Sequence, residues 1–232
     1  PVVIVLAVIS ILYGALLAIG QTDIMRLIAY TSVSHFGFIV LGIFALTTTG
    51  GAGSTLYMLN HGFSTAALFL IGAMLVARRG SKRIPDFGGW QRVTPGLAGV
   101  FLVAGLSGLA LPGLSSFVSE FLVLVGTFQR YKAVAIISTA GIILAALYIL
   151  LMYKRMMTGP RPDLEVAGER VLDITLREKL VVAPLIAAFL VLGFYPKPVL
   201  DVLNPAVSTT LKYVGVSDPA PAVPTTADGS AK

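Results

Sequence analysis

The sequence predicts an all-α integral membrane protein. Hydrophobic residues make up 56% of the 232 positions and charged residues only 12%, with a mean hydropathy of +0.89. A soluble domain of this size would be about one quarter charged. The apolar runs are of helical length and do not alternate in ten-residue segments, which favours a helix bundle over a membrane barrel.

Six membrane crossings are expected, because a helical crossing needs about 20 apolar residues. They are predicted at 1–19, 24–47, 53–77, 95–128, 132–153 and 178–195. The connections are QTD, a TTTGGAG turn over 47–53, a basic loop over 78–92, a short QRYK link and a polar stretch over 154–179.

The fourth crossing is predicted to be a broken helix. Residues 95–128 are too many for one straight crossing, and Pro112 in LPGLSS cannot donate a backbone hydrogen bond. Such a break is tolerated in a membrane only where the freed backbone groups face protein or water. The transmembrane bundle thus covers 1–195, and the C-terminal segment 196–232 follows. That segment is expected to form a short interfacial helix near 199–214 and then a Pro/Ala/Thr tail typical of disorder.

Positive charge indicates the orientation. Cytoplasmic loops of membrane proteins are enriched in Lys and Arg. Twelve of the seventeen basic residues fall on one side of the alternating crossings: Arg26, Arg78, Arg79, Lys82, Arg83, Arg92, Lys154, Arg155, Arg161, Arg170, Arg177 and Lys179. This side is predicted to be cytoplasmic and the C-terminus extracytoplasmic. The net charge of +6 is therefore a topology signal and argues against a nucleic-acid interface.

Several kinds of chemistry lack a basis in the sequence. The absence of Cys excludes disulfides, thiolate-held zinc and cysteine-held iron–sulfur clusters in this chain. The two histidines have no acidic neighbour in sequence, and no phosphate-binding, dinucleotide-binding, zincin or hydrolase motif occurs. No cofactor or metal is expected in this chain itself. The chain begins at Pro1, directly in a crossing and without a signal-peptide pattern, so it is expected to be part of a longer polypeptide.

Glu120 is the leading candidate for a functional residue. It is the only acidic residue within a long apolar stretch, eight positions after Pro112. A charged carboxylate at membrane depth costs about 2.5–3.5 kcal/mol on insertion scales, so an intramembrane acid is by default a candidate for ion or proton handling.

His61 and His35 are the next candidates, because histidine fits a proton relay. Polar residues recur on one helix face in three crossings, which suggests a hydrated seam: Arg26, Tyr30 and Ser34 with His35; Tyr57, Asn60, His61 and Ser64; Ser116, Glu120 and Thr127. The alternatives are simpler. Serine and threonine in membrane helices usually bond their own backbone, Tyr30 and Tyr57 suit packing, and His35 suits a hydrogen bond between helices.

Four segments resemble the antiporter-like subunits of respiratory complex I, the proton-translocating NADH–quinone oxidoreductase. They are QTDIMRLIAYTSVSHFGFIVLGI, LYMLNHGFSTAALFLIGAML, IPDFGGW and LPGLSSFVSEFLVLVGTF, in that order, within residues 10–157. Glu120 together with His35 favours the subunit M (chain 4) branch, since the other branches typically carry Lys at the first position and many carry Gln at the second. Met25 and Ser119 depart from the usual Lys and Gly.

The resemblance implies a role for each candidate. This chain would correspond to the last six of fourteen helices, with Glu120 on the second broken helix exchanging protons with the outside and His61 and His35 on the axis that feeds it. NADH, FMN, iron–sulfur clusters and quinone would be bound by partner subunits. The partners would be the other membrane-arm antiporter-like subunits, the peripheral arm and the lipid bilayer, in a bacterial plasma membrane.

Two other functions remain open. The first is a subunit of a multisubunit cation/proton antiporter without redox activity, since the same helices and buried axis would serve it. The second is a structural scaffold in which Glu120 only fastens neighbouring helices.

Overall fold

The computed structural model describes residues 1–160 and 171–220, and their regular structure is helical apart from one bridge between Asp23 and Arg83. The helices are α1 (Val2–Ile19), α2 (Ile24–Phe44), α3 (Thr48–Arg79), α4 (Pro95–Gly108), α5 (Ser115–Arg130), α6 (Lys132–Met157), α7 (Leu176–Phe194) and α8 (Lys197–Val214), with short 3-10 turns η1 (Ile84–Asp86) and η2 (Trp90–Arg92) before α4. The predicted all-α class is confirmed.

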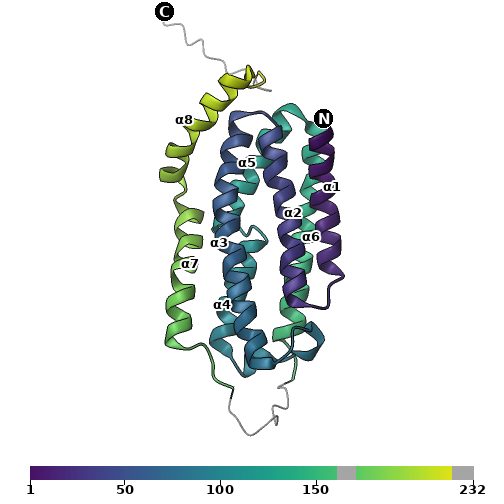
Figure 1. Ribbon diagram of the computed structural model, residues 1–232, viewed down its shortest axis with the longest axis vertical. Coiled ribbons are helices and arrows are strands. Elements are labelled where there is room, and N and C mark those ends of the chain that lie inside the picture. Colours follow the sequence, from purple (N-terminus) through teal and green to yellow (C-terminus); the bar gives the residue numbers. More distant parts are fainter. Residues whose placement is uncertain (161–170, 221–232) are drawn as a thin grey trace, which may run out of the picture.

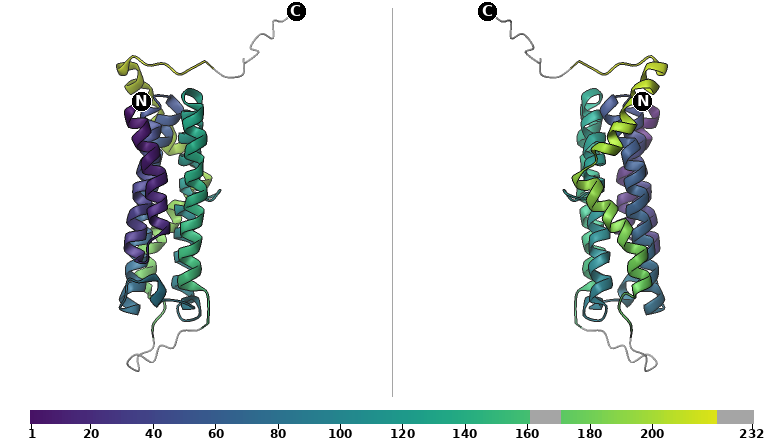
Figure 2. Two further views of the ribbon diagram at one scale, coloured as in Figure 1. Left: turned by 90° about the vertical axis from the view of Figure 1, so that its right-hand side faces the viewer. Right: turned by 90° about the vertical axis from the view of Figure 1, so that its left-hand side faces the viewer.

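The helices form an elongated bundle of two layers with an appended edge (Figures 1 and 2). Helices α1, α2 and α3 lie in one layer, α5 and α6 lie in the other, and α7 and α8 run along one edge. By length and apolar character, α1, α2, α3 and α6 could each cross a membrane, and the bent pair α7–α8 could provide one more crossing. A crossing by the pair α4–α5 remains an expectation.

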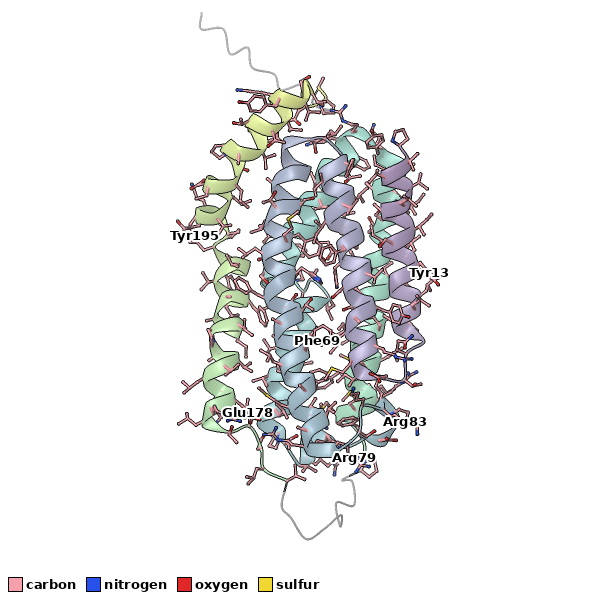
Figure 3. The ribbon with its side chains drawn as sticks, viewed as in Figure 1. Tyr13, Phe69, Arg79, Arg83, Glu178 and Tyr195 are labelled. Carbon is pink, nitrogen blue, oxygen red and sulfur yellow. The ribbon has the colours of Figure 1, made fainter. Side chains whose placement is uncertain are left out.

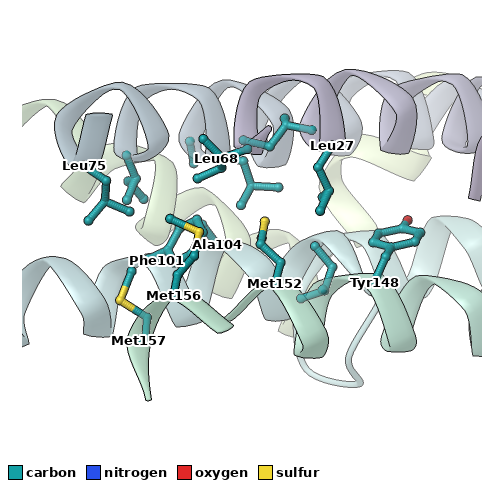
Figure 4. Close-up of a cluster of buried hydrophobic side chains, with 14 of the residues drawn as sticks. Leu27, Leu68, Leu75, Phe101, Ala104, Tyr148, Met152, Met156 and Met157 are labelled. Atoms are coloured by element: carbon teal, nitrogen blue, oxygen red, sulfur yellow. The ribbon is translucent and has the colours of Figure 1, made fainter. Parts of the chain in front are cut away.

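An apolar cluster fills the space between the layers toward the end of the bundle that carries the 78–92 loop. Leu27, Leu68 and Leu75 of α2 and α3 face Phe101 of α4 and Met156 of α6 (Figure 4). Outside the bundle, Tyr13 and Tyr195 are 58% and 61% exposed and point away from it (Figure 3). The apolar outer surface is what a helix bundle presents to lipid or to further membrane helices.

Helix α3 begins earlier than the sequence predicts. Thr47 caps it by accepting a hydrogen bond from the Gly50 amide, and the predicted TTTGGAG turn continues as helix from Thr48. The glycines lie in the helix because neighbouring backbones pack directly on them. A Cβ on Gly50 would lie 3.0 Å from the Gly42 carbonyl oxygen, and one on Gly53 would lie 2.7 Å from the Val123 nitrogen. The turn prediction is wrong because helix packing, which the local sequence does not reveal, overrides the low helix propensity of glycine.

The predicted break near Pro112 is present. Helix α4 ends at Gly108 and α5 begins at Ser115, and the intervening chain places Ala110 and Gly113 at positive φ values of 57° and 92°. The hydroxyls of Ser107 and Ser115 face each other across the break at 3.5 Å. The first turn of α5 therefore starts inside the bundle, close to the end of α4.

The linker before α7 is fastened to two other helices. Arg78 at the end of α3 donates to both carboxylate oxygens of Glu178, at 2.9 and 2.7 Å. Asp173 accepts from the Gly96 and Leu97 amides at the start of α4, at 2.7 and 2.9 Å. Partial burial alone raises the pKa of Asp173, but the Gly96, Leu97 and Ile174 amides together with Arg78 outweigh it and hold that pKa below its ordinary value.

The last two helices bend by 71° at their junction. Beside this bend, Gly193 of α7 lies directly against the backbone of Gly113 in the α4–α5 break. Helix α8 then runs toward the end of the bundle that holds Pro1 (Figure 1). There Asp218 accepts from the Thr48 amide at 2.7 Å and Arg130 donates to the Ser217 carbonyl at 2.9 Å. The expected helix near 199–214 is thus present as α8, whereas the predicted disorder after residue 220 lies outside the described residues, as do Arg161, Arg170 and Lys232.

Candidate functional site

The site lies inside the bundle where α2, α3, α5 and α6 meet. Glu120 on α5 is 2% exposed, and His35 on α2 and His61 on α3 are each 5% exposed. Among the described residues, Glu120 has neither an ion-pair partner nor a protein partner for its Oε1 atom. A buried carboxyl group with so little support is unusual, because uncompensated buried charge costs several kcal/mol.

The two histidines lie side by side. Their ring centroids are 5.3 Å apart, and the rings are tilted by 43°. The hydroxyl of Thr65, one turn further along α3, lies 3.2 Å from Nδ1 of His61. The sequence predicted only that both belong to one seam, and the structure brings them into contact.

Two tyrosines complete the surroundings of His35. The hydroxyl of Tyr57 on α3 lies 2.5 Å from Nδ1, and the hydroxyl of Tyr148 on α6 lies 3.2 Å from Nε2. The Tyr57 hydroxyl also lies close to the Glu120 carboxyl. Within the described part of the chain, Tyr57 is thus a neighbour of both His35 and Glu120. Sequence reasoning assigned Tyr57 to packing and missed Tyr148.

Asn60 ties the acidic helix to α3. Its amide group donates to the Ser115 carbonyl at 2.7 Å and to the Ser119 hydroxyl at 3.2 Å. The Ser115 carbonyl belongs to the first turn of α5, so Asn60 holds the start of that helix against the turn of α3 that carries His61. Oδ1 of Asn60 and Oγ of Ser116 are buried without a described protein partner. Such atoms are usual positions for ordered water.

Other polar residues of the predicted seam do not join the site. Arg26 is exposed, and the Ser34 hydroxyl bonds the Ile11 carbonyl of α1 at 2.8 Å. Ser64 and Thr127 bond carbonyls of their own helices. For these side chains the simpler alternative, a local bond or a bond between helices, is the one observed.

A largely apolar cavity of about 250 Å³ adjoins Glu120 on the side of the helix break. It is lined by the 109–112 segment, by Phe117, Phe121 and Leu124 of α5 and by Ile142 and Ala146 of α6. Among the described residues, no group of three His, Asp or Glu side chains is placed to hold a metal ion. The chemistry that the site offers is proton binding and transfer by a carboxyl group, two imidazoles and phenol hydroxyls.

A helix bundle with an interrupted helix and isolated ionisable groups in its interior is typical of membrane transport proteins that move ions or protons. The chain belongs to the NADH:quinone oxidoreductase/Mrp antiporter transmembrane family, whose model matches residues 1–147.

Individual relatives agree with this family. The chain is 58% identical over 223 residues to NADH-quinone oxidoreductase subunit M of Mycobacterium tuberculosis, covering 96% of this chain and 40% of the relative. It therefore spans less than half the length of this curated relative. The resemblance to the subunit M branch, drawn from the four sequence segments, is confirmed.

Solved structures share the fold. A chain of respiratory complex I from Thermus thermophilus with bound NADH matches with a TM-score of 0.84 and 31% identity, over 93% of this chain and 45% of that chain. A chain of the Mrp complex from Dietzia matches with a TM-score of 0.80 at 20% identity, over 92% of this chain and 48% of that chain. The second likeness concerns the fold alone.

Proposed function

We propose that this chain forms the proton-exit part of a proton-translocating membrane-arm subunit of NADH:quinone oxidoreductase. The observation that carries the proposal is the buried Glu120 carboxyl group, which lies beside a helix break and close to Tyr57, the hydrogen-bond neighbour of His35. The sequence likeness to subunit M relatives supports the same assignment. Glu120, His61 and His35 are the residues proposed to move the proton.

The distance between the histidines limits how much charge the pair can hold. Two positive charges 5.3 Å apart repel by about 3 kcal/mol at an effective dielectric constant of about 20. That energy corresponds to more than a hundredfold in an equilibrium constant, so the pair holds one proton at a time. A change in charge arriving along the membrane arm would then displace that proton toward Glu120.

Glu120 would accept the proton and release it outward. Its carboxyl group is buried without a counterion among the described residues, so its charged form is costly and proton uptake is favoured when a proton is offered. The adjoining cavity at the break provides space beside the carboxyl group. Release to the extracytoplasmic side would complete one transfer.

Redox chemistry is assigned to partner subunits. NADH, FMN, iron–sulfur clusters and quinone would be bound there, and the other antiporter-like subunits and the peripheral arm would be the partners of this chain. The proposed location is a bacterial plasma membrane, with several crossings and the C-terminus extracytoplasmic, in line with the excess of Lys and Arg on the other side.

The test is Glu120→Gln in the assembled complex, with proton translocation and NADH-driven electron flux measured in the same vesicles. Gln keeps the size of the side chain and removes the titrating group, so the number of protons moved per electron is expected to fall. Asp201→Asn is the matched control, because that carboxylate is exposed on α8 and paired with Lys197 at 2.6 Å. Unchanged pumping at normal electron flux in Glu120→Gln would refute the role of Glu120 and favour the scaffold.

A second function is left open by the family, whose description includes the Mrp antiporter. In that case the chain would belong to a cation/proton antiporter without a redox partner. Purification separates the two functions: copurifying flavin and iron–sulfur subunits support the respiratory complex. Sodium-dependent exchange in a complex without them supports the antiporter.

A further inference from the structure

Three buried polar groups are neighbours in the interior: the His35 imidazole, the Tyr57 hydroxyl and the Glu120 carboxyl. Tyr57 is 1% exposed, and its hydroxyl lies 2.5 Å from Nδ1 of His35. The same hydroxyl is within reach of Glu120, whose Oε1 has no described protein partner. The phenol thus lies between the two groups that the proposed function requires to exchange a proton.

Tyr148 provides a hydrogen-bond partner for Nε2, the second ring nitrogen of His35. A neutral imidazole has one nitrogen that donates and one that accepts. When Nε2 carries the hydrogen, it donates to the Tyr148 oxygen 3.2 Å away, and Nδ1 is left to accept from Tyr57. The single hydroxyl hydrogen of Tyr57 then has two possible acceptors, Nδ1 of His35 and the carboxylate of Glu120.

We propose that Tyr57 is a proton-relay residue that connects His35 to Glu120. This inference rests on the proposed function and adds the group through which the proton passes. With His35 doubly protonated, the Nδ1–H bond breaks and its proton binds the Tyr57 oxygen. The Tyr57 O–H bond breaks in the same step, and that proton binds the Glu120 carboxylate.

The relay is balanced in atoms and charge. His35 ends neutral, Tyr57 regains a hydroxyl with a different hydrogen, and Glu120 ends as a neutral carboxylic acid. Rotation of the hydroxyl about its C–O bond returns it toward Nδ1 for the next transfer. A hydroxyl can perform this exchange because its oxygen both donates and accepts a hydrogen bond.

If Tyr57 serves only in packing, a different result is expected for its replacement by phenylalanine. Its ring contacts Phe38 at a centroid distance of 6.4 Å and His61 at 6.4 Å, and those contacts need only an aromatic ring. Phenylalanine preserves the ring and removes only the oxygen. The two roles therefore separate in Tyr57→Phe.

The experiment compares Tyr57→Phe, Tyr30→Phe and Glu120→Gln in the assembled complex. Tyr30 also lies in the bundle, where it packs against the apolar cluster, so its change controls for loss of a tyrosine hydroxyl. Tyr57→Phe is expected to lower the proton-pumping rate at least tenfold and to raise the solvent hydrogen isotope effect on turnover, with assembly retained. Tyr30→Phe is expected to change neither quantity by more than twofold.

The outcomes distinguish the inference from the function on which it rests. Loss of pumping in Glu120→Gln with normal pumping and isotope effect in Tyr57→Phe overturns the relay and leaves the proposed function standing. Normal pumping in Glu120→Gln overturns the proposed function. If Tyr57→Phe does not assemble, 3,5-difluorotyrosine at position 57 keeps the ring and the hydroxyl but makes the hydroxyl a stronger acid. An unchanged pumping rate with that residue also overturns the relay.

Discussion

Replacing Gly126 by Ala should separate α3 from α5 and disturb the site without touching any of its polar groups. A Cβ at position 126 would lie 2.5 Å from the Gly50 Cα and 2.8 Å from the Thr47 hydroxyl oxygen. Ordinary contacts of a Cβ begin at 3.4 Å, so the facing backbones must move apart by about 1 Å.

The expected cost follows from this geometry. Overpacking costs about 1–3 kcal/mol, and backbone atoms on the opposite side cannot relieve the clash by changing rotamer. Alanine regains about 1 kcal/mol of helix propensity over glycine. The net destabilisation is therefore about 1 kcal/mol and at most about 2 kcal/mol.

The functional effect should exceed the loss of stability. Glu120 lies on α5 and Tyr57 and His61 lie on α3, so a shift between these helices changes the distances between these groups. A misplacement of 1 Å can cost a reaction about a hundredfold. We expect a lower ratio of protons moved to electrons transferred, measured in vesicles, together with a lower thermal midpoint of the purified complex.

Gly72→Ala is the matched control. It also adds a methyl group at a buried glycine, but the nearest atom is the end of the Ile28 side chain at 3.4 Å, an ordinary contact. Its pumping ratio should equal that of the wild type. If Gly126→Ala behaves like Gly72→Ala in both measurements, the close α3–α5 contact does not position the site.

Two further predictions concern the ends of helices. Asp173→Asn should destabilise the start of α4 by about 0.5–2 kcal/mol at neutral pH, because it weakens acceptance from the Gly96 and Leu97 amides. Since the pKa of Asp173 is lowered by folding, the stabilisation is present above the ordinary value of 3.8 and is lost as the pH falls below it. The protection of these amides from hydrogen exchange, relative to their intrinsic rates, should fall in that range in the wild type and not in the variant. Thr47→Val should cost about 1 kcal/mol, because the hydroxyl that caps α3 also donates to the Gly126 carbonyl at 3.1 Å. A thermal midpoint equal to that of the wild type would contradict this second prediction.

The parts of the fold that the sequence predicts are those decided by local composition. Helices α1, α2 and α6 stand out as long apolar runs, and Pro112 marks the break between α4 and α5. The start of α3 is missed because its glycines serve contacts with helices distant in sequence. Gly50 faces Gly126, which lies 76 positions later, and nothing in TTTGGAG reveals that neighbour.

The residues of the candidate site also differ in whether the sequence reveals them. Glu120, His61 and His35 can be selected from the sequence, because each is a costly group inside an apolar crossing. Tyr148 cannot, since tyrosine on a membrane helix commonly packs or lies at an interface. Its role becomes visible only where α6 crosses α2 and its hydroxyl reaches Nε2 of His35, 113 positions earlier in the chain.

The contact of Gly193 with Gly113 joins the final helices directly to the turn between α4 and α5. The turn between α4 and α5 lies against the end of α7, beside the bend between α7 and α8. The two backbones are in direct contact there, and no side chain separates them. A shift of one backbone must push the other. Because α8 is also anchored to the Thr48 amide through Asp218, rearrangement of the turn beside Glu120 would be transmitted along α8 to the rim of the bundle.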